Sequence, residues 1–145
     1  TIWSVTQKAT ISRINSCLRL FLLLALVYGI NAGIYNSMKK IVDRPRPFEQ
    51  NRVELRVSIH ETENLSNNGS FPSGHAANAF MLAAILSVVV SRFSPVFYLV
   101  AAAVAFSRVY LGVHFPGDVL VGALIGWMTA QLLLSSKWVK TRIGV

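Results

Sequence analysis

The chain's longest apolar stretch, Leu18–Met38, reads LRLFLLLALVYGINAGIYNSM and decides the fold class. As an α-helix it would be roughly 31 Å long, at about 1.5 Å per residue, which is enough to cross the hydrocarbon core of a bilayer. Three further apolar runs follow it: Ala76–Ser91, the run from Pro95 towards Val113, and Val119–Ser135. The shorter runs are marginal as isolated spans, but neighbouring helices and local thinning of the bilayer accommodate such lengths.

The composition also favours a membrane protein. Hydrophobic residues make up 53% of the chain and charged residues 14%, with a mean hydropathy of +0.50, which is too apolar for an ordinary soluble domain. The net charge is +8, and the basic residues flank apolar runs, so anionic lipid headgroups are the expected partner and nucleic acid is not. The single cysteine, Cys17, excludes an intrachain disulfide.

These patterns predict an all-α integral membrane protein, folded as a compact bundle of about four transmembrane helices. Residues 1–145 are expected to form one domain, because the length suits one domain and not two. Residues 1–17 mix aromatic and aliphatic side chains with Lys8 and Arg13, which predicts a helix lying at the interface, with a soluble tail as the alternative. The polar segment 39–71 is long enough to indicate a functional or a disordered loop.

Small residues indicate close packing between the helices. Gly29 and Gly33 have the GxxxG spacing, and so do Gly122 and Gly126. In lipid, such residues let two helix backbones approach each other, and this packing drives helix association.

The distribution of charge gives a hypothesis for the orientation. With four spans, one face carries seven basic residues and no acids: Lys8, Arg13, Arg19, Arg92, Lys137, Lys140 and Arg142. The other face carries seven basic residues and all six acids; the basic ones are Lys39, Lys40, Arg44, Arg46, Arg52, Arg56 and Arg108. If Lys39, Arg46 and Arg108 bind an anion, the first face has seven remaining basic residues and the second has four. The first face is then predicted to be cytoplasmic.

Polar side chains at the ends of the apolar runs are the candidate functional residues, because such groups are expensive at membrane depth. The first cluster is Lys39 with Arg46-Pro47, after the first run. Both cations suit phosphate oxygens, although a solvated basic stretch beside the membrane has the same composition.

The second cluster is the tetrapeptide Pro72-Ser73-Gly74-His75, which opens the second apolar run. A helix N-terminus offers free N–H groups and the positive end of the helix dipole to an anion, and Gly74 lets the backbone come close to it. On its own, Ser73 is equally well explained as a helix N-cap and His75 as an interfacial histidine.

The third cluster is Ser107-Arg108, then His114, then Asp118. Pro116-Gly117 separates the histidine from the carboxylate, so a turn must bring the two together. Taken alone, Asp118 is also a plausible N-cap of the last helix, and His114 a plausible interfacial residue.

Together the three clusters supply the parts that phosphoryl transfer needs. Cations and a helix N-terminus can hold the phosphoryl oxygens, one histidine held by a carboxylate can act as nucleophile, and a second can act as general acid. The chain offers few clustered carboxylates or histidines as metal ligands.

Lys39-x6-Arg46-Pro47, Pro72-Ser73-Gly74-His75 and Ser107-Arg108-x5-His114-x3-Asp118 resemble the tripartite signature of the type 2 phosphatidic acid phosphatase superfamily, with every signature position matched. The resemblance implies that His114 attacks phosphorus, that Asp118 orients it and that His75 protonates the leaving group. It also implies a set of residues that bind the phosphoryl oxygens: Lys39, Arg46, Ser73, Gly74 and Arg108. Neither a metal nor another cofactor is implied. The third histidine, His60, matches no signature position.

The sequence therefore predicts a metal-independent hydrolase that removes phosphate from a lipid, as monoester or pyrophosphate, through a phosphohistidine. Candidate substrates are phosphatidylglycerol phosphate, phosphatidic acid, undecaprenyl pyrophosphate and the 1-phosphate of lipid A. The expected setting is a bacterial inner membrane with the site facing the periplasm or exterior, membrane lipids as surroundings and no obligate protein partner. Alternatives are a silent lipid-phosphate sensor or assembly subunit, and a vanadate-dependent haloperoxidase, which the four apolar runs oppose.

Family members commonly have two further helices before the span that ends in the Lys–Arg motif, whereas this chain shows one span there. The expectation is either a minimal member, with residues 1–17 as an interfacial remnant, or a chain without its N-terminal helices. This difference concerns the path by which substrate enters the site. The catalytic residues that the resemblance implies are all present.

Overall fold

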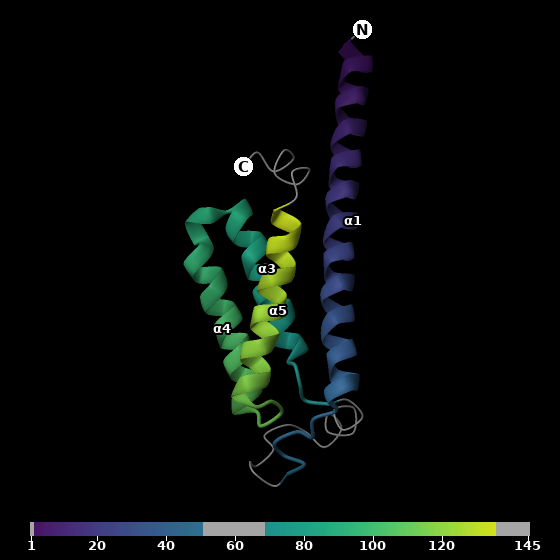
Figure 1. Ribbon diagram of the computed structural model, residues 1–145. Coiled ribbons are helices and arrows are strands. Elements are labelled where there is room, and N and C mark those ends of the chain that lie inside the picture. Colours follow the sequence, from purple (N-terminus) through teal and green to yellow (C-terminus); the bar gives the residue numbers. More distant parts are fainter. Residues whose placement is uncertain (1, 51–68, 136–145) are drawn as a thin grey trace.

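The computed structural model describes residues 2–50 and 69–135, and this part of the chain contains helices and no strand. Four α-helices and one 3₁₀ turn follow in order: α1 (Ile2–Val42), α3 (Gly74–Val89), η1 (Ser91–Phe93), α4 (Ser94–Tyr110) and α5 (Pro116–Leu134). Figure 1 shows them lying roughly side by side, with successive helices running in opposite directions. The predicted all-α membrane fold is confirmed.

Three of the helices contain segments long and apolar enough to cross a membrane: Phe21–Val42, Ser91–Tyr110 and Pro116–Leu134. The remaining predicted span is the second apolar run, which forms α3. This helix has 16 residues and is shorter than the other three segments. It packs against α5, α4 and α1, so its neighbours cover much of its surface. Protein contacts thus compensate for its short length, as a bundle allows.

Helix α1 differs from the prediction at its N-terminal end. The segment expected to form a separate interfacial helix continues directly into the first span, giving one helix of 41 residues. The sequence contains no proline in this helix and no glycine before Gly29, so nothing interrupts the backbone hydrogen bonds. At its other end, α1 stops at Val42. Asp43 follows with a positive φ of 39°, and Pro45 comes two residues later.

The two glycine pairs have different surroundings. A Cβ atom built on Gly122 would overlap the carbonyl oxygen of Ser73, and one built on Gly126 would overlap that of Ala77. Helix α5 therefore lies backbone to backbone against α3, as the GxxxG spacing predicts. Gly29 and Gly33 have no atom within 4 Å of such a Cβ among the described residues. The predicted packing role is thus seen in the second pair, whereas the first pair makes no such contact with the described residues.

A small apolar core and one polar pair join α1 to the other helices. The core cluster comes from α1, α3 and α5: Val27, Met81, Ala84, Ile85 and Ala130. One turn further along α1, the fully buried Asn31 donates its Nδ2 hydrogen to Oδ1 of Asn78 on α3, at 2.8 Å. Outward-facing side chains such as Leu99, Phe106 and Leu132 are large and apolar, as expected for a surface in contact with lipid.

Candidate active site

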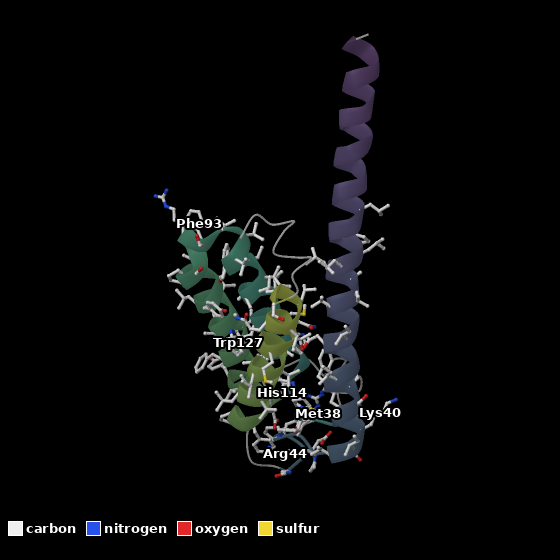
Figure 2. The ribbon with its side chains drawn as sticks, turned by 45° about the horizontal axis from the view of Figure 1, so that its top comes forward. Met38, Lys40, Arg44, Phe93, His114 and Trp127 are labelled. Carbon is white, nitrogen blue, oxygen red and sulfur yellow. The ribbon has the colours of Figure 1, made fainter. Side chains whose placement is uncertain are left out.

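All three sequence clusters lie at the same end of the bundle. The C-terminal end of α1, the start of α3, the turn between α4 and α5 and the start of α5 converge there (Figure 1). Figure 2 shows Arg44 and His114 at this end, whereas Phe93 lies at the opposite end. Of the expected polar loop, residues 51–68 lie outside the described residues, and so does His60.

Ser73 ties the starts of two helices together. It is the N-cap of α3, where its hydroxyl oxygen accepts from the N–H of Ala76 at 3.4 Å. Its own backbone N–H donates to the carbonyl oxygen of Asp118 at 2.9 Å. This bond joins the second and third clusters directly, although 45 residues separate them in the sequence. The capping role that the sequence left open for Ser73 is confirmed.

Gly74 begins α3 and lies close to α1. A Cβ at this position would be 2.9 Å from Cε2 of Tyr35, so a side chain here would press on the tyrosine ring. His75 follows on the first turn of α3 and is exposed. It lies within electrostatic reach of several other predicted site residues: Lys39, Arg46, Arg108 and His114.

The turn after α4 presents His114. The backbone N–H groups of Val113 and His114 both donate to the carbonyl oxygen of Arg108, at 3.2 and 3.3 Å. Gly112, with a φ of 74°, takes the left-handed conformation that this turn requires and that glycine adopts without strain. The turn leaves the His114 side chain 4% exposed.

Asp118 is fully buried and lies in the first turn of α5. It is not the N-cap that the sequence offered as an alternative: the cap is Phe115, because Pro116 occupies the first helical position, where a proline is preferred. From its place in the first turn, the Asp118 carboxylate reaches back and accepts from the Phe115 N–H through Oδ2, at 2.9 Å. A negative charge is also favourable at this end of a helix.

The imidazole of His114 faces this carboxylate. Its Nδ1 lies 3.7 Å from Oδ2 of Asp118, which is longer than a hydrogen bond, and Nδ1 has no hydrogen-bond partner among residues 2–50 and 69–135. The predicted pairing of histidine and carboxylate is thus present as a close approach. With Nδ1 turned towards Asp118, Nε2 is the ring nitrogen that does not face the carboxylate.

Three predicted cations surround these groups. Lys39 donates from Nζ to the carbonyl oxygen of Gly69 at 2.7 Å. Arg46 is 3% exposed and donates from Nη1 to the carbonyl oxygen of Val113 at 3.0 Å, next to His114 in the chain. Arg108 is half-buried, and its buried Nε–H has no hydrogen-bond partner in the described part of the chain. A buried donor of this kind is suited to an anion.

Burial and nearby charges set the ionisation of the groups in the connecting turns. Burial lowers the pKa of His114 below its ordinary value of 6.5; Arg46 and Lys39 lower it further, while Asp118 opposes the shift. Burial also lowers the pKa of Arg46, and Glu49 and Asp118 oppose it. A guanidinium remains charged despite such a shift. The site therefore combines a neutral imidazole with a strongly cationic surrounding at pH 7.

One residue of this site, Arg44, was missed by the sequence analysis. Its Nη1 lies 2.8 Å from Oδ1 of Asp118, and its guanidinium carbon lies 4.0 Å from the centre of the Phe115 ring. In the sequence it looks like one more basic residue beside the membrane. The one available signal was the repeated dipeptide Arg-Pro-Arg-Pro at 44–47, which offers two arginines where the signature uses one.

Within residues 2–50 and 69–135, no group of three or more His, Cys, Asp or Glu side chains could hold a metal ion.

Comparison with known proteins identifies the family. Residues 19–142 match the PAP2 superfamily model, which covers all three clusters and most of the chain. The chain belongs to the PAP2 superfamily. It is similar to phosphatidylglycerophosphatase B of Bacillus subtilis, at 32% identity over 116 residues, which are 72% of this chain and 52% of the relative. It is also similar to the lipid A 4′-phosphatase of Bacteroides thetaiotaomicron, at 45% identity over 61% of this chain and 40% of the relative.

The fold agrees with this assignment to PAP2. A crystal structure of a transmembrane PAP2-type phosphatidylglycerolphosphate phosphatase from Bacillus subtilis matches with a TM-score of 0.59 and 30% sequence identity. The match covers 79% of this chain and 56% of the other. The chain therefore spans about half the length of the relatives it matches.

Proposed function

We propose that this PAP2 chain is a membrane phosphatase that hydrolyses a lipid phosphate monoester or pyrophosphate through a phosphohistidine intermediate, without a metal ion. The observation that carries the proposal is the buried His114, which faces Asp118 at 3.7 Å at the end of the bundle where Lys39 and Arg46 converge. A neutral imidazole beside fixed positive charges suits attack on a phosphoryl group.

In the first step, the lone pair of His114 Nε2 forms a bond to phosphorus while the bond from phosphorus to the leaving oxygen breaks. His75, exposed on the first turn of α3, is protonated at the start of this step and gives its proton to that oxygen, which leaves His75 neutral. In the second step, water attacks phosphorus, returns a proton to His75 and releases Nε2 and inorganic phosphate. Asp118 stabilises the positive charge that His114 carries between the steps, and the contact shortens to a hydrogen bond.

The surrounding donors are suited to the three equatorial oxygens of the transferring phosphoryl group. Lys39, Arg46 and Arg108 supply positive charge, and Ser73 and Gly74 supply the start of α3, where free N–H groups and the helix dipole favour an anion. The unpaired Nε–H of Arg108 supports this assignment, since a phosphoryl oxygen would give it a partner.

A lipid is the favoured substrate because the site lies at the end of helices whose outer faces are apolar. Phosphatidylglycerol phosphate, phosphatidic acid, undecaprenyl pyrophosphate and lipid A phosphates all combine an acyl or prenyl body with a terminal phosphate. The printed names of the relatives, a phosphatidylglycerophosphatase and a lipid A 4′-phosphatase, fall in this class.

We further propose that the site faces the exterior or periplasm of a bacterial inner membrane. Among the described residues, all three acids lie at the site end (Asp43, Glu49 and Asp118), and the basic turn at Arg92 lies at the other. With Lys39, Arg46 and Arg108 assigned to the phosphoryl group, the sequence leaves four basic residues for the site end and seven for the other end, and the more basic end is expected in the cytoplasm.

The test is release of inorganic phosphate by the purified protein in detergent with EDTA, across a panel of those four lipid phosphates, against a mock purification. We expect release from at least one lipid. No release from any of them, with inorganic phosphate still bound, would support a lipid-phosphate sensor.

The proposed orientation has its own test. Intact spheroplasts should hydrolyse a membrane-impermeant phosphate ester before lysis, and turnover only after lysis would contradict the proposed face.

The pH dependence follows from the direction of the His114 shift. Because the pKa of His114 lies below 6.5, the neutral nucleophile predominates at pH 7 and is lost as the pH falls through that lower value. We expect the pH profile of kcat/KM to have an acid limb, a fall towards low pH, whose midpoint lies below pH 6.5, as measured with a monoester and a pyrophosphate. An acid limb that lies at the same pH with both substrates comes from the protein and not from ionisation of the substrate.

Arg46→Gln provides the check on the cause of the shift. Removing this positive charge should move the acid limb to higher pH, because Arg46 contributes to the lowering of the His114 pKa. A limb shared by both substrates that lies above pH 6.5 in the unmodified protein would contradict the prediction.

A further inference from the structure

Arg44 is held on two sides by parts of the site. Its Nη1 forms an ion pair with Oδ1 of Asp118 at 2.8 Å, and its guanidinium carbon lies 4.0 Å from the centre of the Phe115 ring. The arginine side chain is 39% exposed, while the carboxylate it contacts is fully buried. A planar guanidinium suits both contacts at once, since it can stack on a ring and donate to a carboxylate.

This ion pair acts together with the Phe115 N–H to fix which way the Asp118 carboxylate faces. Oδ1 accepts from Arg44, while Oδ2 accepts from the Phe115 N–H at 2.9 Å and lies 3.7 Å from Nδ1 of His114. The two oxygens of a carboxylate are fixed relative to each other, so holding Oδ1 also holds Oδ2 towards the imidazole. Without Arg44, a fully buried oxygen would lose its cationic partner, and rotation about the Cβ–Cγ bond would be less restricted.

The other cations have different contacts. Lys39 and Arg46 donate to the carbonyl oxygens of Gly69 and Val113, and their charges act on His114. Arg44 instead directs its guanidinium to Oδ1 of Asp118, whereas the oxygen nearest to His114 is Oδ2. This geometry separates a group that orients the carboxylate from groups that surround the reacting phosphorus.

We propose that Arg44 is a positioning residue, which keeps the Asp118 carboxylate turned towards His114 and does not bind the phosphoryl group. The inference rests on the proposed function, because it assigns to Arg44 a role that acts through the carboxylate of the histidine nucleophile.

The first test separates positioning from binding. For Arg44→Gln we expect kcat to fall about 10- to 100-fold, since small errors of alignment have effects of this size, with KM within about twofold. Inhibition by orthovanadate, a phosphate mimic, should also stay within about twofold. Arg44→Lys should recover part of kcat, because an amine can pair with the carboxylate but cannot stack as a planar fork. A large rise in KM, weaker inhibition by vanadate, or an increase in kcat would overturn the proposal.

Lys40→Gln is the matched control for loss of one positive charge. Lys40 lies four residues before Arg44, is exposed, and points away from the other helices in Figure 2. We expect its kcat and KM to stay within about twofold of the unmodified protein. A fall like that of Arg44→Gln would show that charge alone is responsible and would contradict a role for the ion pair.

The decisive test combines Arg44→Gln with Asp118→Ala. If Arg44 acts through Asp118, adding its substitution to Asp118→Ala should lower kcat by less than about twofold more, because alanine has no oxygen for Arg44 to contact. Equal losses in both backgrounds would overturn the proposal. Failure of the proposed function has a different result: an inactive unmodified protein, or turnover retained by His114→Ala. Unfolding temperatures of all variants identify any that do not fold, and Arg44→Lys then carries the comparison.

Discussion

Replacing His114 with alanine is expected to lower kcat by at least about 10⁴-fold, because the proposed chemistry has no route around its nucleophile. The imidazole is buried and faces Asp118, and its turn is fixed by two backbone bonds to the Arg108 carbonyl oxygen. No other described histidine faces a carboxylate at this distance; His75 is exposed on the first turn of α3. Phosphate release from the best lipid of the panel is the measurement.

The matched control is His60→Ala, which removes a histidine that has no place in the three motifs. Its kcat should stay within about twofold. Rapid quenching after mixing with ³²P-labelled substrate should trap a phosphoprotein that is labile to acid and stable to base, and that is absent from His114→Ala. Turnover retained in His114→Ala, with its unfolding temperature unchanged, would overturn the proposed mechanism.

His75→Ala distinguishes the two histidines. If His75 protonates the leaving oxygen, its loss should matter less for p-nitrophenyl phosphate, whose leaving group needs no proton, than for a lipid phosphate. His114→Ala should be defective on both substrates alike. An equal loss on both substrates in His75→Ala would argue that His75 binds the phosphoryl group and does not act as an acid.

The second large effect is expected on stability, at Gly126. A Cβ at this position would overlap the backbone carbonyl oxygen of Ala77, and a backbone atom cannot move aside without displacing α3 from α5. We expect Gly126→Ala to reduce the free energy of unfolding by about 3 kcal/mol, at the upper end of overpacking effects. The measurement is the unfolding temperature in detergent, together with the fraction of protein that elutes as a single species.

Gly29→Ala is its matched control. It makes the same change at the same GxxxG spacing in α1, where a Cβ would meet no atom within 4 Å. Its effect should be near zero or slightly stabilising, since alanine is the better helix former. If both variants lower the unfolding temperature equally, loss of glycine in general, and not the contact with Ala77, would be responsible.

The comparison of these glycines also shows how far the sequence could predict the fold. Hydropathy is a local property, so the apolar runs predicted the helices and the membrane class from composition alone. The GxxxG spacing indicated close packing but could not say which pair has a partner, because that depends on where another helix lies. The sequence analysis placed a boundary between two helices at Cys17 and Leu18 because the polarity of the sequence changes there. The structure has one continuous helix across these residues. A helix ends where its hydrogen bonds are interrupted, and nothing interrupts them there.

For the site, the motifs indicated the residues but not all of their contacts. His114, Asp118 and Arg46 could be named because their types and spacing match a known signature. Asp118 was also considered as an N-cap, and only the structure shows Phe115 in that place. Arg44 could not be found in the same way, because its role depends on an ion pair across 74 residues of sequence. A contact of that kind is a property of the folded chain.

The hydrogen bond from the Ser73 N–H to the Asp118 carbonyl oxygen has a consequence for biosynthesis. Lys39, Arg46 and the start of α3 leave the ribosome before His114, Asp118 and the whole of α5. A nascent chain can thus carry Lys39 and Arg46 in the membrane well before it carries the proposed nucleophile. Because α5 brings Asp118 to the site and also packs against α3, we expect phosphatase activity to appear only after α5 has been inserted.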